Sequence, residues 1–237
     1  MAVEASEATA DVDLGQTSLR ELNQRLHDVA GDSPSPRFWR VLNPNGAHAV
    51  ACGLDAPVEV EILGHVGYYC AGMNKHATVR VRGNAGTGVA ENLMSGTVVV
   101  EGSVSQSAGA TGRGGLLIVH GDAGARCGIS MKGIDIVVRG SIGHMSAFMA
   151  QRGCLVVCGD AGDALGDSIY ETHIYVRGAI KGLGADCIEK ELREHHRSEL
   201  RALLDRSGCE ELDVSEFRRY GSARELYNFK IDNAGAY

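Results

Sequence analysis

The side chains best suited to redox or metal chemistry are seven cysteines and nine histidines. The cysteines are odd in number and include no Cys-x-x-Cys pair, which favours free thiols in a reducing compartment over a disulfide framework. Cys154 and Cys158 would lie about 13 Å apart along one strand. Cys70 and Cys127, three repeats apart, would be separated by about 14 Å. We therefore expect no iron–sulfur, zinc or other metal site on this chain alone.

Glu171 and His173 form the one candidate acid–base pair. Side chains at i and i+2 of a strand point the same way, but no third group that would orient the histidine is evident in the sequence. The Gly-x-Ser-x-Gly, His-Glu-x-x-His and P-loop motifs are missing, and the start Met1-Ala2 offers no N-terminal cysteine nucleophile. We expect no catalytic and no cofactor-binding residue here.

Glycine-rich stretches such as Gly83-Asn-Ala-Gly86-Thr-Gly88 look like phosphate-binding loops. A dinucleotide fingerprint, however, lies between a strand and a helix of a βαβ unit. These stretches instead recur at one register of an internal repeat, which indicates a structural corner.

The repeat is defined by glycines spaced 19 residues apart without an insertion, which we call the anchor glycines: Gly64, Gly83, Gly102, Gly121, Gly140, Gly159 and Gly178. The residues two and four positions before each anchor are apolar in all seven repeats, and the residue just before it is mostly polar. This alternation predicts a short strand before every anchor. Another apolar residue follows two positions after the anchor, and a second glycine usually follows three positions after it.

One such repeat cannot bury its apolar face alone, whereas stacked repeats pair strand over strand at about 4.8 Å. Glycine at the corners would permit the positive φ that corners often need. Seven positions after each anchor only Ala or Gly occurs, which predicts a narrow, filled interior. A leucine-rich repeat is disfavoured because its Leu and Asn signature is missing. We predict an all-β fold, a right-handed single-stranded β-helix of seven 19-residue coils over residues 47–185.

The segments outside the repeat predict helices. In the N-terminal extension, residues 1–46, the Ser18–Glu21 capping box and the apolar spacing predict a helix over 18–30. We expect disorder in the first 15 or so residues and an irregular connector around Phe38-Trp39. In residues 186–237, a helix from Asp186 to Asp205 would seal the open end of the solenoid, and residues 209–237 would form a partner-binding arm.

Charge and hydropathy exclude several classes of partner. The 237 residues carry 30 acidic against 23 basic side chains, a formal charge of −7, and no basic stripe that could follow a phosphate backbone. No apolar run approaches the roughly 20 residues of a membrane span, and the first residues do not resemble a signal peptide. We expect a cytoplasmic protein that binds neither nucleic acid nor membrane.

Residues 45–190 resemble the GXGXG β-helix family, named after the domain at the end of the glutamate synthase large subunit. The stretches Gly140-Ser-Ile-Gly-His-Met-Ser-Ala-Phe-Met-Ala150 and Gly159-Asp-Ala-Gly-Asp-Ala-Leu-Gly166 carry the resemblance. The stand-alone length and Gly184-Ala-Asp-Cys-Ile-Glu-Lys-Glu191 are similar to the small GXGXG subunit of N-methylglutamate synthase. A structural subunit of formylmethanofuran dehydrogenase shares the fold.

The resemblance implies a non-catalytic scaffold subunit of an FMN-dependent complex. Its partners would be an amidotransferase-type subunit and an FMN-binding subunit, which also carries an iron–sulfur cluster. The complex would make N-methylglutamate from glutamate and methylamine, with ordinary glutamate formation as a close alternative. A structural subunit of a tungsten or molybdenum formylmethanofuran dehydrogenase is the second hypothesis. A free-standing binding module is the third, although only 5% of the residues are aromatic.

If any residues line a passage or an interface in such a complex, we expect them in the second-corner loops of the middle coils. The sequence varies there, and the side chains should face outward. They are Gln106, Arg126, His144, Met145 and Ser146.

Overall fold

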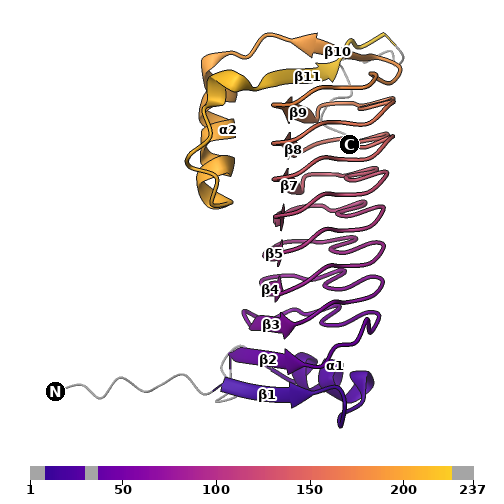
Figure 1. Cartoon of the computed structure of the whole chain (residues 1–237), viewed down its shortest axis with the longest axis vertical. Helices are drawn as coiled ribbons and strands as arrows, with labels where there is room; N and C mark the ends of the chain where they lie inside the picture. The colour runs from indigo at the N-terminus through magenta and orange to yellow at the C-terminus, as the bar shows by residue number, and fades with distance from the viewer. Residues whose placement is uncertain (1–8, 30–36, 226–237) are drawn as a thin grey trace, which may run out of the picture.

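The computed structural model describes residues 9–29 and 37–225. It shows a tall stack of coils with one strand of each coil aligned along the same side (Figure 1). The eleven strands form one sheet in the order β1-β2-β3-β4-β5-β6-β7-β8-β9-β11-β10. The predicted all-β solenoid is confirmed. Neither helix of the described part is long and apolar enough to cross a membrane.

Seven parallel strands carry the 19-residue repeat, and each pairs in register with the next. Val60 pairs with Val79, and Val79 in turn pairs with Val98, so equivalent residues stack in columns. The strands are β3 (Glu59–Leu63), β4 (Thr78–Val81), β5 (Thr97–Val100), β6 (Leu116–Val119), β7 (Asp135–Val138), β8 (Cys154–Val157) and β9 (His173–Val176).

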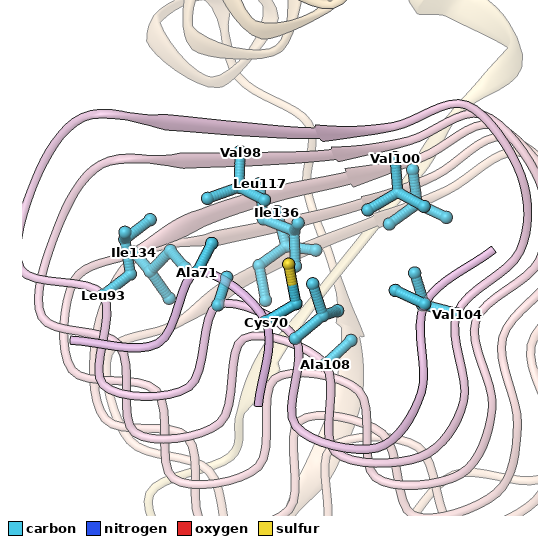
Figure 2. Packing of buried hydrophobic residues seen from close by; sticks show 14 of the residues in the cluster. Cys70, Ala71, Leu93, Val98, Val100, Val104, Ala108, Leu117, Ile134 and Ile136 are labelled. Atoms are coloured by element: carbon cyan, nitrogen blue, oxygen red, sulfur yellow. The ribbon is translucent and has the colours of Figure 1, made fainter. Parts of the chain in front are cut away.

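The solenoid interior is filled by columns of apolar side chains, as the repeat predicts. Leu117 and Ile136, four residues before their anchors, are fully buried and lie over one another (Figure 2). The opposite wall is formed by the column that contains Val104, which bridges to Ala85 on one side and Ala123 on the other. Burial of these columns between neighbouring coils is the main source of stability in such a stack.

The second glycines, three residues after the anchors, lack the positive φ that the sequence led us to expect at this corner, for example at Gly86 and Gly124. The anchor glycines are required by close stacking. Only Gly64 among the seven has a positive φ, of 147°. A Cβ placed on Gly121 would lie 2.8 Å from the carbonyl carbon of Gly102 in the coil below. Positive φ occurs instead seven residues after the anchor, for example at Gly128 (69°) and Ala147 (56°). The small residues there fit a left-handed turn as well as a narrow interior.

A polar ladder on the residue after each of the first six anchors joins successive coils. Asn84 accepts a hydrogen bond from the Ser103 backbone N–H at 2.8 Å, and Asp122 accepts one from the Ser141 N–H at 2.7 Å. Between them, the Ser103 hydroxyl accepts from the Asp122 N–H at 3.1 Å. Ser141 and Asp160 continue the same pattern. Each side chain thereby satisfies a backbone donor in the next coil.

The N-terminal end is more ordered than we predicted. Residues 9–13 form strand β1 (Thr9–Asp13), and the expected connector at Phe38-Trp39 is strand β2 (Phe38–Leu42), so both extend the sheet in parallel below β3. The predicted first helix is confirmed as α1 (Leu19–His27), where the Ser18 hydroxyl accepts from the Glu21 N–H at 3.2 Å. Its buried Leu22 and Leu26 close this end of the core.

The C-terminal end differs from the predicted helical seal. The chain continues after β9 into strand β10 (Cys187–Lys190), and helix α2 (Glu194–Arg206) begins eight residues later than Asp186. A 3₁₀ turn, η1 (Val214–Glu216), leads into β11 (Arg218–Ser222), which inserts antiparallel between β9 and β10. Strands, not a helix, therefore cover the last coil. Part of the predicted arm folds onto the solenoid, and residues 226–237 lie outside the described part.

Helix α2 runs along the flank of the stack, beside β7, β8 and β9 (Figure 1). Its buried Leu200, Leu203 and Leu204 join a second apolar cluster, separate from the interior core. The sheet contributes the outward-facing side chains of its later strands, among them Val137 and Val156. The later strands of the sheet are therefore apolar on both faces. Their inner face lines the core of the solenoid, and α2 covers their outer face.

Candidate functional site

The structure brings four of the five predicted loop residues to one side of the solenoid. The carbonyl of Gln106 accepts from the Gly88 N–H at 3.1 Å, and the carbonyl of His144 accepts from the Arg126 N–H at 2.9 Å, so the loops stack coil over coil. The side chains of Gln106, Arg126 and His144 are exposed, and Met145 is partly exposed. Arg126 and Met145 have φ values of 58° and 54°. These four residues form a surface that we call the corner-loop face.

Ser146 does not belong to this face. Its side chain is fully buried, and its hydroxyl donates to the Gly143 carbonyl at 2.9 Å. It occupies the inward column that holds Cys127 and Leu165 in neighbouring coils, which are buried as well. The expectation of an outward Ser146 was therefore wrong, because the chain has already turned into the interior one residue after Met145.

The candidate pair Glu171 and His173 is not a pair in the structure. Both carboxylate oxygens of Glu171 accept from Arg224, at 2.9 and 3.1 Å. His173 instead places Nδ1 2.8 Å from Oε2 of Glu199 on α2. The third, orienting group that was not evident in the sequence is thus present for His173, and it comes from the C-terminal helix.

His173 belongs to a cluster of potential metal ligands, which we call the Cys–His–Glu cluster: Cys154, His173 and Glu199. One ligand atom from each residue lies within 4.8 Å of the others. Cys154 and His173 start the adjacent parallel strands β8 and β9 and are direct pairing partners. Glu199 reaches them from α2, whose neighbouring Leu200 is buried against the sheet. Two strands and a helix therefore position three different ligand types around one point.

Hydrogen bonds hold Glu199 in its charged form. Burial alone would raise the pKa of this carboxyl, but the hydrogen bonds from His173 and Tyr175 outweigh burial and lower the pKa to about 2. The Tyr175 hydroxyl donates to the same Oε2 atom that faces His173. Burial raises the pKa of the Tyr175 hydroxyl, and the neighbouring Glu199 raises it further.

One more acidic group, Asp135, lies beside the Cys154 thiol of the cluster. Burial raises the pKa of the Cys154 thiol, and the charges of Glu199 and Asp135 add to this effect. Burial also raises the pKa of Asp135, whose Oδ1 accepts from the Cys154 N–H at 3.1 Å. A thiol and two carboxylates therefore lie together beneath α2. An arrangement of this kind can hold a divalent cation.

Histidines of α2 border the cluster on one side. The His196 ring lies 5.0 Å from the His173 ring at an interplanar angle of 85°, and its Nδ1 accepts from the Arg193 N–H at 3.2 Å. Burial, followed by the charge of Arg219, lowers the pKa of His196 to about 4. His196 is therefore neutral at physiological pH and adds no positive charge to offset the carboxylates.

A small polar pocket of about 50 Å³ opens beside His173. Lys190 and Arg219 contribute basic side chains to its lining. Within the described part of the chain, Oγ1 of Thr172 and Nε of Arg219 are buried without a hydrogen-bond partner. The pocket supplies polar surroundings next to the cluster, and its size suits one or two water molecules.

We did not predict the Cys–His–Glu cluster from the sequence, although the repeat indicates that two of its three residues lie side by side. Cys154 and His173 both stand five residues before an anchor glycine, in adjacent coils, so the repeat alone places them side by side. Glu199 carries no such signal, because it lies 26 residues beyond His173 on a helix whose docking the repeat does not predict. All seven cysteines are free thiols in the structure.

No family model matches the sequence. Protein GlxC of Rhizobium meliloti (strain 1021) is 62% identical to it over 226 residues, which cover 95% of this chain and 99% of that protein. The similarity thus spans the N-terminal helix, the solenoid and α2 together. An identity of this size over nearly the whole length shows common ancestry, and the chain belongs to the family of Protein GlxC.

Proposed function

We propose that this chain is a non-catalytic scaffold subunit of a glutamate-synthase-like, FMN-dependent complex. The observation that carries the proposal is the uninterrupted solenoid, with seven strands at one 19-residue spacing that pair in register from β3 to β9. The resemblance of residues 45–190 to the GXGXG domain of glutamate synthase supports it. The chain would pack between an amidotransferase-type subunit and an FMN-binding subunit, which also carries the iron–sulfur cluster.

A filled, register-locked solenoid suits this role for a physical reason. Close-packed interiors are hard to compress, so a stack of constant pitch holds two partner subunits at a fixed spacing. A fixed spacing favours transfer of a small amine between two active sites over its loss to water. We propose the corner-loop face, with Gln106, Arg126 and His144 exposed on it, as the surface that meets a partner or borders the passage.

Within this role we propose N-methylglutamate synthesis from glutamate and methylamine as the reaction of the complex. The support is the resemblance in chain length and in the segment 184–191 to the small GXGXG subunit of N-methylglutamate synthase. The alternative is that the complex uses ammonia and makes glutamate. The experiment must distinguish this alternative from the use of methylamine.

The test is mild affinity capture of the full chain from its native cell, followed by identification of the co-purifying chains and a visible absorption spectrum. We expect an amidotransferase-like chain to co-purify with this chain, and we expect the sample to show a flavin spectrum. The activity of the complex can then be measured with glutamine, ammonia or methylamine as the substrate. A chain that emerges colourless and alone would contradict the proposal. Recovery of a tungsten or molybdenum enzyme would favour the formylmethanofuran-type complex instead.

A charge-reversal variant tests the corner-loop face in the same capture experiment. Arg126→Glu should reduce recovery of at least one partner, because the exposed side chain lies within the proposed contact surface. Arg113→Glu is the matched control, since this arginine is also exposed but lies outside the corner-loop face. Equal recovery with both variants would exclude this face as the contact surface while leaving the scaffold role open to other faces.

A further inference from the structure

We propose that Cys154, His173 and Glu199 bind one zinc ion, which fastens α2 to the flank of the solenoid. The proposal does not depend on the identity of any partner subunit. It assigns a metal site to a chain in which the sequence alone predicted none.

The geometry is close to that of a zinc site. Tetrahedral zinc has bonds of about 2.3 Å to sulfur and about 2.0–2.1 Å to nitrogen or oxygen, so its ligand atoms lie roughly 3.5 Å from one another. In the structure the three ligand atoms lie within 4.8 Å of each other, and the His173 Nδ1 to Glu199 Oε2 distance is 2.8 Å. Small movements of side chains that are already adjacent would therefore form the site.

The ligand types favour zinc over calcium and magnesium. Thiolate and imidazole together suit zinc, whereas calcium and magnesium prefer oxygen ligands alone. A Cys154 thiolate and a Glu199 carboxylate would also balance the two positive charges of the ion, so the ion and its three ligands together would carry no net charge. This neutrality matters because burial of an uncompensated charge is costly.

The protons can be accounted for at each ligand. Binding releases the Cys154 thiol proton to solvent. The proton that lies between His173 Nδ1 and Glu199 moves through solvent to Nε2, so that Nδ1 is free to bind the ion and the ring stays neutral. Three protein ligands leave a fourth position, which a water molecule would fill, as in other zinc sites with three protein ligands.

Surrounding residues orient the ligands in the way that outer-shell partners of metal sites do. The Tyr175 hydroxyl donates to Glu199, and Asp135 accepts from the backbone N–H of Cys154 at 3.1 Å. Cys154 is only 5% exposed, and apolar residues of the α2–sheet cluster pack around it. The cluster is thus braced before any ion binds, with Cys154 buried and the His173 and Glu199 side chains 30% and 37% exposed.

The competing explanation is that the same three residues only form a hydrogen-bonded anchor for α2. The two explanations differ in what they predict for added metal. A hydrogen-bonded anchor would gain nothing from zinc, whereas a zinc site would bind it with one ion per chain and stabilise α2 against local opening.

The first experiment uses the untagged full chain, freed of metal with a chelator and titrated with Co²⁺ as a spectroscopic substitute for zinc. We expect saturation at one ion per chain, visible bands of tetrahedral cobalt, and a near-ultraviolet sulfur-to-cobalt charge-transfer band. Cys154→Ser should lose the charge-transfer band. Cys158→Ser is the matched control, because this cysteine is also buried and lies four residues further along, outside the Cys–His–Glu cluster.

A second measurement guards against a variant that fails to fold. Added Zn²⁺ should raise the melting temperature of the wild-type chain and of Cys158→Ser, and slow amide exchange in α2, while leaving Cys154→Ser and His173→Ala unchanged. The proposal is overturned if the wild-type chain binds no cobalt. It is equally overturned if cobalt binds without the sulfur band, or if Cys154→Ser responds to metal as the wild-type chain does.

Discussion

The outer face of the sheet changes character from one end of the solenoid to the other, whereas the inner face does not. Three residues before the anchor, the early coils carry Glu61 and Arg80, and the later coils carry Ile118, Val137 and Val156. The inner columns are apolar from β3 to β9. The apolar inner face is therefore what each coil needs in order to stack on its neighbours. The outer face varies, and its residues decide whether another element can pack against the sheet. Helix α2 lies where the outer column is apolar.

The two ends of the outer face are stabilised by different interactions. At the charged end, Arg82 bridges Glu61 at 2.6 Å and Glu101 at 2.7 Å. Such ion pairs, whose side chains remain partly exposed to water, contribute little to folding stability. At the apolar end, the side chains are removed from water by α2, and burial of this kind contributes far more. Variants on the two ends should therefore differ in size of effect and in what they disrupt.

The largest effect is expected for Val137→Asp, at the covered end. Val137 is fully buried beneath α2, and an uncompensated buried charge costs about 3–5 kcal/mol. We expect α2 to detach while the solenoid keeps its interior. Amide exchange resolved by peptide should therefore rise in α2 and not in β3–β5. Arg80→Val on the charged end is the control, with a change within about 0.5 kcal/mol. Unchanged exchange of α2 in Val137→Asp would refute this account.

Leu200→Ala should have the next largest effect, because it removes the helix side of the same contact. The Leu200 side chain is fully buried, and truncating such a residue costs about 2–3 kcal/mol. Urea denaturation followed by helical circular dichroism should report the loss. Ile188→Ala serves as the control, since Ile188 is 43% exposed and loses less buried apolar area than the fully buried Leu200. Equal losses in the two variants would argue against α2 docking through Leu200.

Asp122→Ala should have a smaller effect, on the polar ladder that both ends share. The variant leaves the Ser141 backbone N–H without its 2.7 Å partner, at a cost of about 1 kcal/mol. Exchange of the Ser141 amide should accelerate, with little change in α2. Asp122→Asn keeps the Oδ1 acceptor and should preserve protection, so a fast Ser141 amide in Asp122→Asn would show that charge, not hydrogen bonding, matters.

The smallest effect is expected for Arg82→Gln, at the charged end of the outer face. The substitution removes the bridge to Glu61 and Glu101, but all three side chains are partly exposed. The melting temperature should fall by less than in Asp122→Ala, and the difference should vanish at high ionic strength, where surface charges are screened. A difference that persisted in high salt would mean that Arg82 packs in a way that its exposure does not suggest.

The sequence by itself determined the repeating part of the molecule. The 19-residue spacing of the anchor glycines and the apolar columns before them predicted β3 to β9, their parallel stacking and the filled interior, all of which are confirmed. The reason is that each coil contacts only its neighbours, so one local pattern, repeated, decides both the strand and its partner. The helix after Ser18 was likewise predicted, because helix capping is a local interaction.

The tertiary structure decided everything that joins segments distant in the sequence. The return of β11 between β9 and β10, the docking of α2 on the flank and the meeting of Glu199 with Cys154 and His173 depend on contacts that no single repeat encodes. The sequence predicted a helix near the C-terminus but not which surface it would cover, because its apolar stripe fits any exposed apolar surface. Only the path of the chain after β9 determines which apolar surface the helix contacts.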